Sequence, residues 1–255
     1  MLTTTPAHDF SSSGKTTAVR DQLRAAVAEV LESRRRPLRL GKDAFLAVLL
    51  AEDWGNCLIH PEEERILPPL ACEKKRNEFV LGRAAARYAL RELGVYAPVL
   101  RGDHGEPLWP EGILGSITHC WPWAVALVVK SRRQIAVGID LENVEQAARV
   151  DISRLICTAK ELDWVRHSLS FHERIAMVFS AKETVYKGFY PFCRQYIDFG
   201  DVELSWIRER QSFRVSVPGG TQTEFPPLLG CEVHCRCLEG LVFSCMVHET
   251  ALGTV

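Results

Sequence analysis

The sequence has no apolar run long enough to span a lipid bilayer. A membrane-spanning helix needs about 20 consecutive apolar residues, whereas the apolar run from Val125 to Val129 has only the length of a strand. The N-terminus also lacks a basic segment followed by an apolar one, because residues 3–17 are largely polar. We therefore expect no membrane association and no secretory signal.

Neither sign of charge dominates the sequence. Lysine and arginine together number 31, and aspartate and glutamate 32, which gives a net charge of −1 at pH 7. A nucleic-acid-binding domain usually has a marked basic excess, so we expect no nucleic-acid partner. The 9 cysteines without a secretory signal are typical of reduced thiols, which predicts a cytoplasmic protein.

A complete phosphate-binding loop is also missing. Gly14-Lys15-Thr16 resembles the end of such a loop, but the earlier glycine is absent and no strand precedes it. Phosphate chemistry, if the chain performs it, must therefore come from other segments.

The order of expected elements indicates a mixed α/β fold. With 255 residues, 47% of them apolar, the chain can form one large domain or two of similar size. The apolar patterns predict a helix start at 61–64, helices at 16–33 and 72–93 and, as one helix or two, at 158–190. Alternating patterns predict strands at 45–50, 113–119, 123–129, 134–142, 202–209, 212–217, 232–238 and 241–248. We expect a flexible N-terminus at 1–15, an N-terminal subdomain at 16–131 and a C-terminal subdomain at 132–255.

Two acidic motifs are the most informative part of the sequence. Val137–Glu142 is apolar and then acidic, the pattern of a buried strand whose end exposes Asp140 and Glu142. Side chains two positions apart on a strand point to the same face, so these carboxylates lie side by side. They repel each other unless a cation lies between them. Phe179–Lys187 is a helical segment that adds a third carboxylate, Glu183.

Lysines flank the third carboxylate. Lys182 precedes Glu183, and Lys187 follows it by one helical turn. Mg²⁺ prefers oxygen ligands and often completes its coordination with phosphate oxygens of a substrate. Three carboxylates with lysines beside them therefore indicate a Mg²⁺ site that acts on a phosphorylated substrate.

Arginines line one face of the helix expected at 72–93. Arg76, Arg83 and Arg87 recur at helical spacing and form a basic stripe. Such a stripe can bind phosphate groups or can be a solvated surface, and the sequence leaves both readings open for Arg76 and Arg83. Arg87 is assigned to the solvated surface.

With these segments identified, the sequence resembles the 4′-phosphopantetheinyl transferases. The resemblance is closest to the bacterial type with two subdomains that activates siderophore, polyketide and nonribosomal peptide synthases, the enterobactin and surfactin type. Any one motif is weak, but several in the same order are specific. The matching segments are Lys75–Arg83, Gly102–Pro107, Gly115–Cys120, Gly138–Glu142 and Phe179–Lys187.

The resemblance implies a reaction and a fold. The enzyme would transfer the 4′-phosphopantetheine arm of coenzyme A to a serine of an apo acyl or peptidyl carrier protein. The by-product would be adenosine 3′,5′-bisphosphate. The fold would consist of two pseudo-symmetric α/β subdomains with the active site in the cleft between them, and the protein would be a monomer.

The resemblance also implies roles for the acidic motifs. Asp140, Glu142 and Glu183 would bind Mg²⁺. Glu183 would in addition accept the proton of the carrier serine, directly or through a water. Lys187 would contact the pyrophosphate and, with His119, would belong to the catalytic group.

Other residues would hold coenzyme A. Arg76 and Arg83 would bind its 3′-phosphate, because a guanidinium fork matches phosphate oxygens. Thr118 and His119 would contact its phosphates, and Lys182 would hold another phosphate or face water. The remaining positions expected at coenzyme A are His104, where many relatives have lysine or arginine, Gly105, Asp140 and Lys187.

Simpler readings compete with these assignments. Ser180 and Glu183 match a helix capping box, Glu183 and Lys187 match a helical ion pair, and His119 alone could be a core histidine. Two rival functions are another Mg²⁺-dependent phosphoryl transferase and a carrier-binding scaffold without catalysis. Coenzyme A binding separates the first rival from the expected enzyme, and turnover separates the second.

Overall fold

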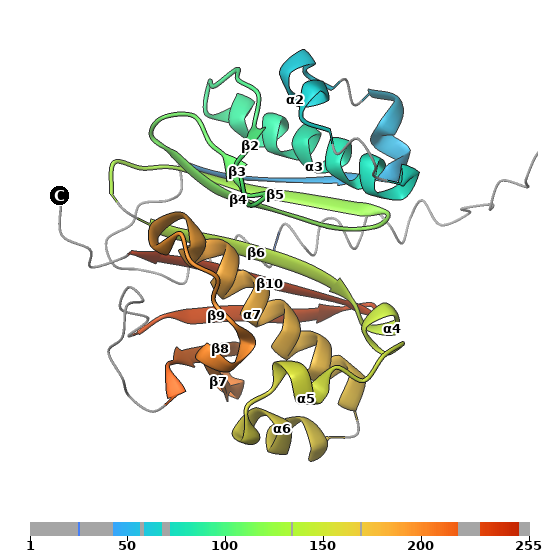
Figure 1. Cartoon of the computed structure of the whole chain (residues 1–255), viewed down its shortest axis with the longest axis vertical. Coiled ribbons are helices and arrows are strands. Elements are labelled where there is room, and N and C mark those ends of the chain that lie inside the picture. The colour runs from blue at the N-terminus through green and yellow to red at the C-terminus, as the bar shows by residue number, and fades with distance from the viewer. Residues whose placement is uncertain are drawn as a thin grey trace, which may run out of the picture.

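The computed structural model describes residues 25, 43–56, 59–67, 72–133, 135–168, 170–218 and 230–249. Within these residues two antiparallel sheets each carry one long helix (Figure 1). The helix predicted at 16–33 and the flexible segment predicted at 1–15 lie almost entirely outside the described residues. No helix in the described part is long and apolar enough to cross a bilayer.

The first sheet has three strands in the order β1-β5-β4. They are β1 (Ala44–Leu50), β4 (Ile113–Cys120) and β5 (Trp123–Lys130). Helix α3 (Glu73–Glu92) covers one face of this sheet with alanines and leucines, whose modest size allows close packing. The short helix α2 (Pro61–Arg65) precedes it and has proline at its start with acids in its first turn.

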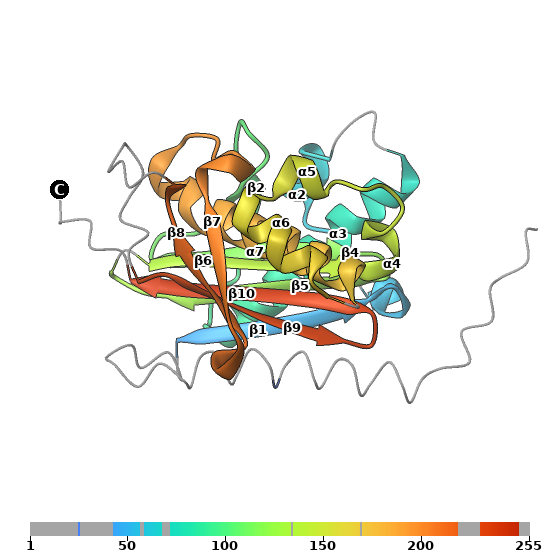
Figure 2. The ribbon, with the colours of Figure 1, turned by 90° about the horizontal axis from the view of Figure 1, so that it is seen from below.

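The second sheet has five strands in the order β6-β10-β9-β8-β7. They are β6 (Ile135–Asn143), β7 (Glu203–Ile207), β8 (Ser212–Ser216), β9 (Glu232–Leu238) and β10 (Leu241–Glu249). Helix α7 (Phe171–Cys193) packs across β6, β10 and β9. Figure 2 shows helices α5, α6 and α7 on the same side of this sheet.

Shorter elements connect these parts. They are η2 (Ala51–Asn56), α4 (Val144–Ala147), α5 (Ser153–Ile156), α6 (Ala159–Arg166), η3 (Phe199–Asp201) and η4 (Arg208–Arg210). Strands β2 (Leu100–Arg101) and β3 (Pro107–Leu108) pair as a small hairpin that carries the loop at 102–106.

Three apolar clusters form the core of the described residues: one between α3 and the first sheet, one between the two sheets, and one between α7 and the second sheet. In β6, Val137, Ile139 and Leu141 face the cluster between the sheets, whereas Ala136 belongs to the cluster under α7. This alternation follows from the two-residue period of a strand. Because both faces of β6 are covered, its sequence is a nearly continuous apolar run until Asp140.

Helix α7 lies unusually close to β6 at Gly138. A Cβ atom at this position would lie 2.0 Å from the carbonyl oxygen of Thr184 and 3.2 Å from the backbone nitrogen of Gly188. Only glycine permits this approach of helix backbone to strand backbone. The contact fixes the part of α7 that carries Glu183 and Lys187 against the end of β6.

The secondary structure predicted from the sequence is largely confirmed in the described residues. Helices and strands are present at all the predicted positions within them, with ends that differ by a few residues. The segment 158–190 is two helices, and Thr158 caps the first of them in the predicted capping box. The mixed α/β fold is confirmed. The division into subdomains at residue 131 and their pseudo-symmetry stay predictions.

Candidate active site

The candidate site lies where β4, β6 and α7 meet. Strands β4 and β6 are edge strands of different sheets and lie beside each other. Side chains join them: Ser116 Oγ accepts a hydrogen bond from the backbone N–H of Ile139 at 3.1 Å. Thr118 Oγ1 accepts one from the N–H of Leu141, also at 3.1 Å. These hydroxyls satisfy buried edge N–H groups of β6 that would otherwise lack acceptors.

Asp140 is the central side chain of the site and is only 3% exposed. Its Oδ1 accepts hydrogen bonds from Thr118 Oγ1 at 3.1 Å and from Lys187 Nζ at 2.5 Å. Its Oδ2 is buried and has no hydrogen-bond partner among the described residues. A buried carboxylate oxygen without a donor is costly. The arrangement therefore favours an additional cation or donor at this atom.

The surroundings of Glu142 and Glu183 raise the pKa of both carboxyl groups. Burial raises the pKa of Glu142 to about 8, and the charges of Asp140 and Glu183 add to this while Lys187 opposes it. Burial also raises the pKa of Glu183, with Asp140 adding and Lys187 opposing. Acids that repel one another in a partly dry site respond in this way when positive charge is insufficient.

Lys187 is the cation of this group. Burial alone would lower the pKa of its ammonium, but the charge of Asp140 and the hydrogen bond to it, followed by the charges of Glu183 and Glu142, outweigh burial and raise the pKa. Lys187 is therefore protonated at neutral pH. In the described part of the chain, no three His, Cys, Asp or Glu side chains are grouped closely enough to hold a metal ion alone.

His119 lies at the edge of the site, and its side chain is about half exposed. Its Nδ1 lies 3.9 Å from Glu78 Oε2 on α3. Partial burial lowers the pKa of His119, Glu78 raises it, and Lys187 lowers it, with a net decrease. The imidazole is therefore largely neutral at pH 7, and a phosphate beside it would favour its protonated form.

The predicted basic stripe of α3 is only partly a surface feature. Arg76 is exposed, but Arg83 is 6% exposed and its guanidinium lies 4.6 Å from the ring centroid of Phe79. It donates to the carbonyl of Leu100 at 3.2 Å, and its Nε has no partner within the described ranges. Burial and the charge of Arg101 lower the pKa of Arg83 to about 10. Arg83 thus has unused capacity to bind an anion.

The assignment of Arg87 to a solvated surface is wrong. Its side chain is 12% exposed and forms an ion pair with the buried Glu63. Glu63 Oε1 also accepts from the N–H of Val99 at 2.9 Å, and its Oε2 from the N–H of His60 at 3.4 Å. Glu63 accepts two backbone hydrogen bonds in addition to its contact with Arg87, which offsets the cost of burying its charge.

The expectation that Lys182 holds a phosphate or faces water is also wrong. Lys182 is 3% exposed, and its ammonium donates to three acceptors within the protein. The alternative reading of Ser180 and Glu183 as a capping box is wrong as well, because α7 begins at Phe171 and Ser180 lies within it. Lys187 forms its ion pair with Asp140, a contact between elements rather than along the helix.

A cavity of about 210 Å³ adjoins the site between the loop at 102–106 and α7. His104, Gly105 and Lys187 line it, together with aromatic side chains that include Tyr190. The ring centroids of His104 and Tyr190 lie 6.0 Å apart. Gly105 has φ +94°, a conformation that favours glycine. The cavity brings the glycine-containing loop and the acidic helix to one place, although their motifs are distant in sequence.

The structure thus gathers Asp140, Thr118 and Lys187 in direct contact, with the other two acids near enough to shift one another's pKa. Three neighbouring groups were missed by sequence reasoning: Ser116, Glu78 and Arg101. Ser116 and Glu78 lie inside the matched motifs, but nothing in the sequence assigned them partners. Arg101 lies directly before the glycine-containing loop and offered no signal beyond its charge.

Neighbouring carboxylates of which one is buried, a protonated lysine and a buried arginine are groups with which enzymes handle phosphate esters. The fold and the site therefore define a mixed α/β enzyme of phosphate chemistry. Residues 62–129 match the model of the 4′-phosphopantetheinyl transferase N-terminal domain, and residues 136–226 match that of the 4′-phosphopantetheinyl transferase superfamily.

Named relatives agree with this match. The 4′-phosphopantetheinyl transferase PptT of Mycobacterium tuberculosis is 32% identical over 83% of this chain and 95% of its own length. Svp of Streptomyces mobaraensis is 31% identical over 80% of this chain and 84% of its own length. Enterobactin synthase component D of Salmonella typhi is 40% identical over 47% of this chain and 50% of its own.

The chain therefore belongs to the 4′-phosphopantetheinyl transferase superfamily, as the sequence resemblance indicated, and is a transferase of phosphopantetheine to carrier proteins. Among solved structures, Thermotoga maritima holo-[acyl-carrier-protein] synthase covers 45% of this chain and 62% of its own, with a TM-score of 0.37 and 22% identity. That likeness is too low to add to the argument.

Proposed function

We propose that the enzyme takes coenzyme A as donor, requires Mg²⁺, uses Glu183 as general base and releases adenosine 3′,5′-bisphosphate. The acceptors we propose are acyl or peptidyl carrier proteins of siderophore, polyketide or nonribosomal peptide synthesis, since a relative is an enterobactin synthase component. The monomeric state and the cytoplasmic location stay predictions.

One observation carries the proposal: Lys187 and Asp140 form a contact of 2.5 Å that leaves Asp140 Oδ2 without a partner in the described part of the chain. A lysine at this place offsets the charge of a pyrophosphate, and an open carboxylate oxygen accepts a metal ion. A substrate with a pyrophosphate requires both a cationic side chain and a ligand for the metal ion that accompanies it.

The groups around Asp140 fit Mg²⁺ in part. Asp140 Oδ2 has no hydrogen-bond partner among the described residues, and the raised pKa of Glu142 indicates a carboxyl group that would become ionised beside a cation. Mg²⁺ commonly binds through one or two carboxylates and completes its shell with waters and substrate phosphates. We propose Asp140 and Glu142 as ligands, with Glu183 beside them. When bound, the ion would stabilise negative charge on the pyrophosphate.

Coenzyme A would be held mainly by cationic groups. Arg83 is buried and its Nε has no partner in the described part of the chain, and Arg76 is exposed on the same helix. We propose that both bind the 3′-phosphate, where planar guanidinium groups match phosphate oxygens. Thr118 and His119 would contact the other phosphates, and His104 and Gly105 line the adjoining cavity.

The chemical step is a displacement at phosphorus. The oxygen of the carrier serine forms a bond to the β-phosphorus of coenzyme A, and the serine proton passes to Glu183. The bond from that phosphorus to the oxygen bridging to the adenosine side breaks, and its electron pair leaves with adenosine 3′,5′-bisphosphate. Lys187 offsets charge on this leaving group, and the raised pKa of Glu183 suits a base that works near neutral pH.

Intact-mass spectrometry of an apo acyl carrier protein tests these roles. The carrier is incubated with coenzyme A and Mg²⁺ and with the wild type, Glu183→Gln, or the exposed control Glu145→Gln. We expect a phosphopantetheine-sized mass gain with the wild type and the control. Chelation of Mg²⁺ and Glu183→Gln should each abolish it. Undiminished transfer by Glu183→Gln would contradict the base, and undiminished transfer with chelator would contradict the metal.

A further inference from the structure

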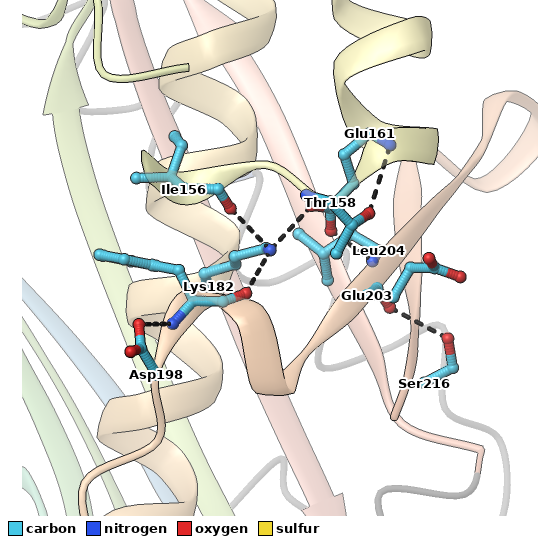
Figure 3. Close-up of polar contacts among 9 residues, drawn as sticks. Ile156, Thr158, Glu161, Lys182, Asp198, Glu203, Leu204 and Ser216 are labelled. Carbon is cyan, nitrogen blue, oxygen red and sulfur yellow. Dashed lines mark hydrogen bonds and ion pairs between the residues drawn. The ribbon is translucent and has the colours of Figure 1, made fainter. Parts of the chain in front are cut away.

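Lys182 occupies a buried polar centre of its own, directly before Glu183 in α7. Its Nζ donates to the carbonyl of Ile156 at 2.8 Å, to Glu161 Oε2 at 2.8 Å and to the carbonyl of Phe199 at 2.6 Å (Figure 3). An ammonium group has three donors. All three are therefore engaged by the protein, and Lys182 has none left for a substrate phosphate.

Glu161 is equally well satisfied on the other side of the pair. It is 2% exposed, and its Oε1 accepts from the N–H of Leu204 at 2.6 Å. Its Oε2 accepts from the N–H of Thr158 at 2.6 Å as well as from Lys182. The pair thus joins the start of α6, the end of α5, η3, β7 and α7. A buried ion pair persists only with such additional hydrogen bonds.

The same arrangement occurs in the other half of the molecule. Glu63, like Glu161, is the third residue of a helix with a capping box, is fully buried and pairs with a cation from the long helix, here Arg87. Glu63 also accepts from the backbone of Val99, as Glu161 does from that of Leu204. The half that holds Glu63 lacks the catalytic carboxylates. A similar buried ion pair there indicates that such a pair holds a long helix in place.

Because Lys182 directly precedes Glu183 in α7, its buried ion pair also affects the position of the active-site residues. Successive residues on a helix point about 100° apart, so a helix whose Lys182 side chain is fixed cannot rotate without moving Glu183. The contact between Lys187 and Asp140 depends on the same rotation. Gly138 sets how closely α7 approaches β6, and the hydrogen bonds of Lys182 attach the same helix to α5, α6 and η3.

We propose that Lys182 and Glu161 are a positioning pair that holds α7 in the rotation at which Glu183 and Lys187 face the reacting groups. Neither member of the pair contacts coenzyme A. This inference rests on the proposed function, in which Glu183 is the base. It assigns to Lys182 a role other than the phosphate contact that the sequence motif suggested.

Steady-state kinetics of two variants separate positioning from phosphate binding. Lys182→Met and Glu161→Gln should each lower kcat about 10- to 100-fold, because small displacements of a catalytic group have effects of this size. KM for coenzyme A, and its affinity measured by calorimetry, should change less than about 3-fold. The matched control is Lys160→Met. Lys160 lies beside Glu161 in α6, and the change removes its ion pair with Glu203 at the surface. This variant should keep the wild-type kcat and KM.

Two kinetic results would overturn the proposal. If Lys182→Met raised KM for coenzyme A 10-fold or more while Glu161→Gln left it unchanged, Lys182 would be a phosphate ligand. If both variants folded and kept wild-type kcat, the pair would not position the catalytic groups.

Urea unfolding of the same variants and of the double variant Lys182→Met/Glu161→Gln tests the ion pair without any substrate. Each single change leaves a buried partner unsatisfied, so the double variant should unfold at a higher urea concentration than the sum of the single shifts predicts. Strict additivity would contradict the pair. If the shifts were not additive but the wild type modified no carrier protein, the ion pair would be supported and only the proposed function would be contradicted. If a single variant fails to fold, Glu161→Asp and the double variant carry the kinetic comparison.

Discussion

Thr118 and Asp140 are joined by a hydrogen bond that crosses from one sheet to the other. Thr118 Oγ1 donates to Asp140 Oδ1 at 3.1 Å and accepts from the N–H of Leu141 at 3.1 Å. This hydroxyl therefore joins β4 to β6, as Ser116 does two residues earlier, and also orients the central carboxylate. Lys187 donates to the same oxygen, so both donors lie on Oδ1, and Oδ2 has no hydrogen-bond partner among the described residues.

Replacement of Thr118 by valine should distinguish the contribution of the hydroxyl from that of the side-chain volume. Valine keeps the volume but leaves the buried N–H of Leu141 without its acceptor, which costs about 1–3 kcal/mol of unfolding free energy. Thr118→Ser retains the hydroxyl and is the matched control. Urea unfolding measures the difference, and carrier modification should fall with valine more than with serine. Equal stability of the two variants would show that the seam does not depend on the hydroxyl.

The close approach at Gly138 predicts a strong effect of a single methyl group. In Gly138→Ala the new Cβ would meet the carbonyl oxygen of Thr184, so α7 must move away from β6. We expect a loss of about 1–3 kcal/mol or more in unfolding free energy and a large fall in turnover, because α7 carries Glu183 and Lys187. Gly200→Ala is the control, since its Cβ would meet nothing within 4 Å. Similar stability and turnover in both variants would contradict the role of this contact.

The sequence was sufficient to predict most helices and strands of the described residues, because these elements leave local signals. The roles of the site residues stay predictions. The apolar run of β6 ends in Asp140 and Glu142, and the helical segment with Glu183 and Lys187 is continuous in pattern. Their meeting at one place followed from the family resemblance, and the structure supplies the direct contact of Lys187 with Asp140.

The buried ion pairs were not predictable in the same way. A lone Lys182 or Arg87 in a helix is expected to be solvated, because burial of a charge is costly without a partner. The partners, Glu161 and Glu63, are distant in sequence and were recognised only as helix-start residues. The capping box suggested by Ser180 was a wrong prediction of another kind. Its local pattern indicates a helix start, but Ser180 lies inside a longer helix that packs on the sheet.

The raised pKa of Glu142 predicts an unusual dependence of stability on pH. Burial, the charge of Asp140 and that of Glu183 raise this pKa from 4.5 to about 8. Between these values the folded state binds more protons than the unfolded state, so stability falls as pH rises through the window. Glu142→Gln removes this loss. Without metal, its melting temperature should exceed that of the wild type at pH 8.5 and match it near pH 5.

Mg²⁺ provides the second half of this experiment. It should raise the melting temperature of the wild type at pH 8.5 and have a smaller effect on Glu142→Gln, because one proposed ligand is lost. Glu145→Gln, on the exposed side of α4, should respond as the wild type does. Parallel melting curves of wild type and Glu142→Gln across pH would contradict the raised pKa.

The lowered pKa of His119 predicts that acid decreases the stability of the protein and increases its affinity for coenzyme A. Burial lowers its pKa below 6.5, against the influence of Glu78. As pH falls through 6.5 to the lower folded-state pKa, the unfolded state binds more protons, so the protein loses stability. A bound phosphate favours the protonated imidazole, so coenzyme A affinity should gain from the same change in pH. Calorimetry at pH 6 and pH 8 compares the wild type with His119→Gln and with the exposed control His172→Gln. The ratio of the coenzyme A affinity at pH 6 to that at pH 8 should be smaller in His119→Gln than in the wild type and in His172→Gln. An equal ratio in all three proteins would place His119 away from the phosphates.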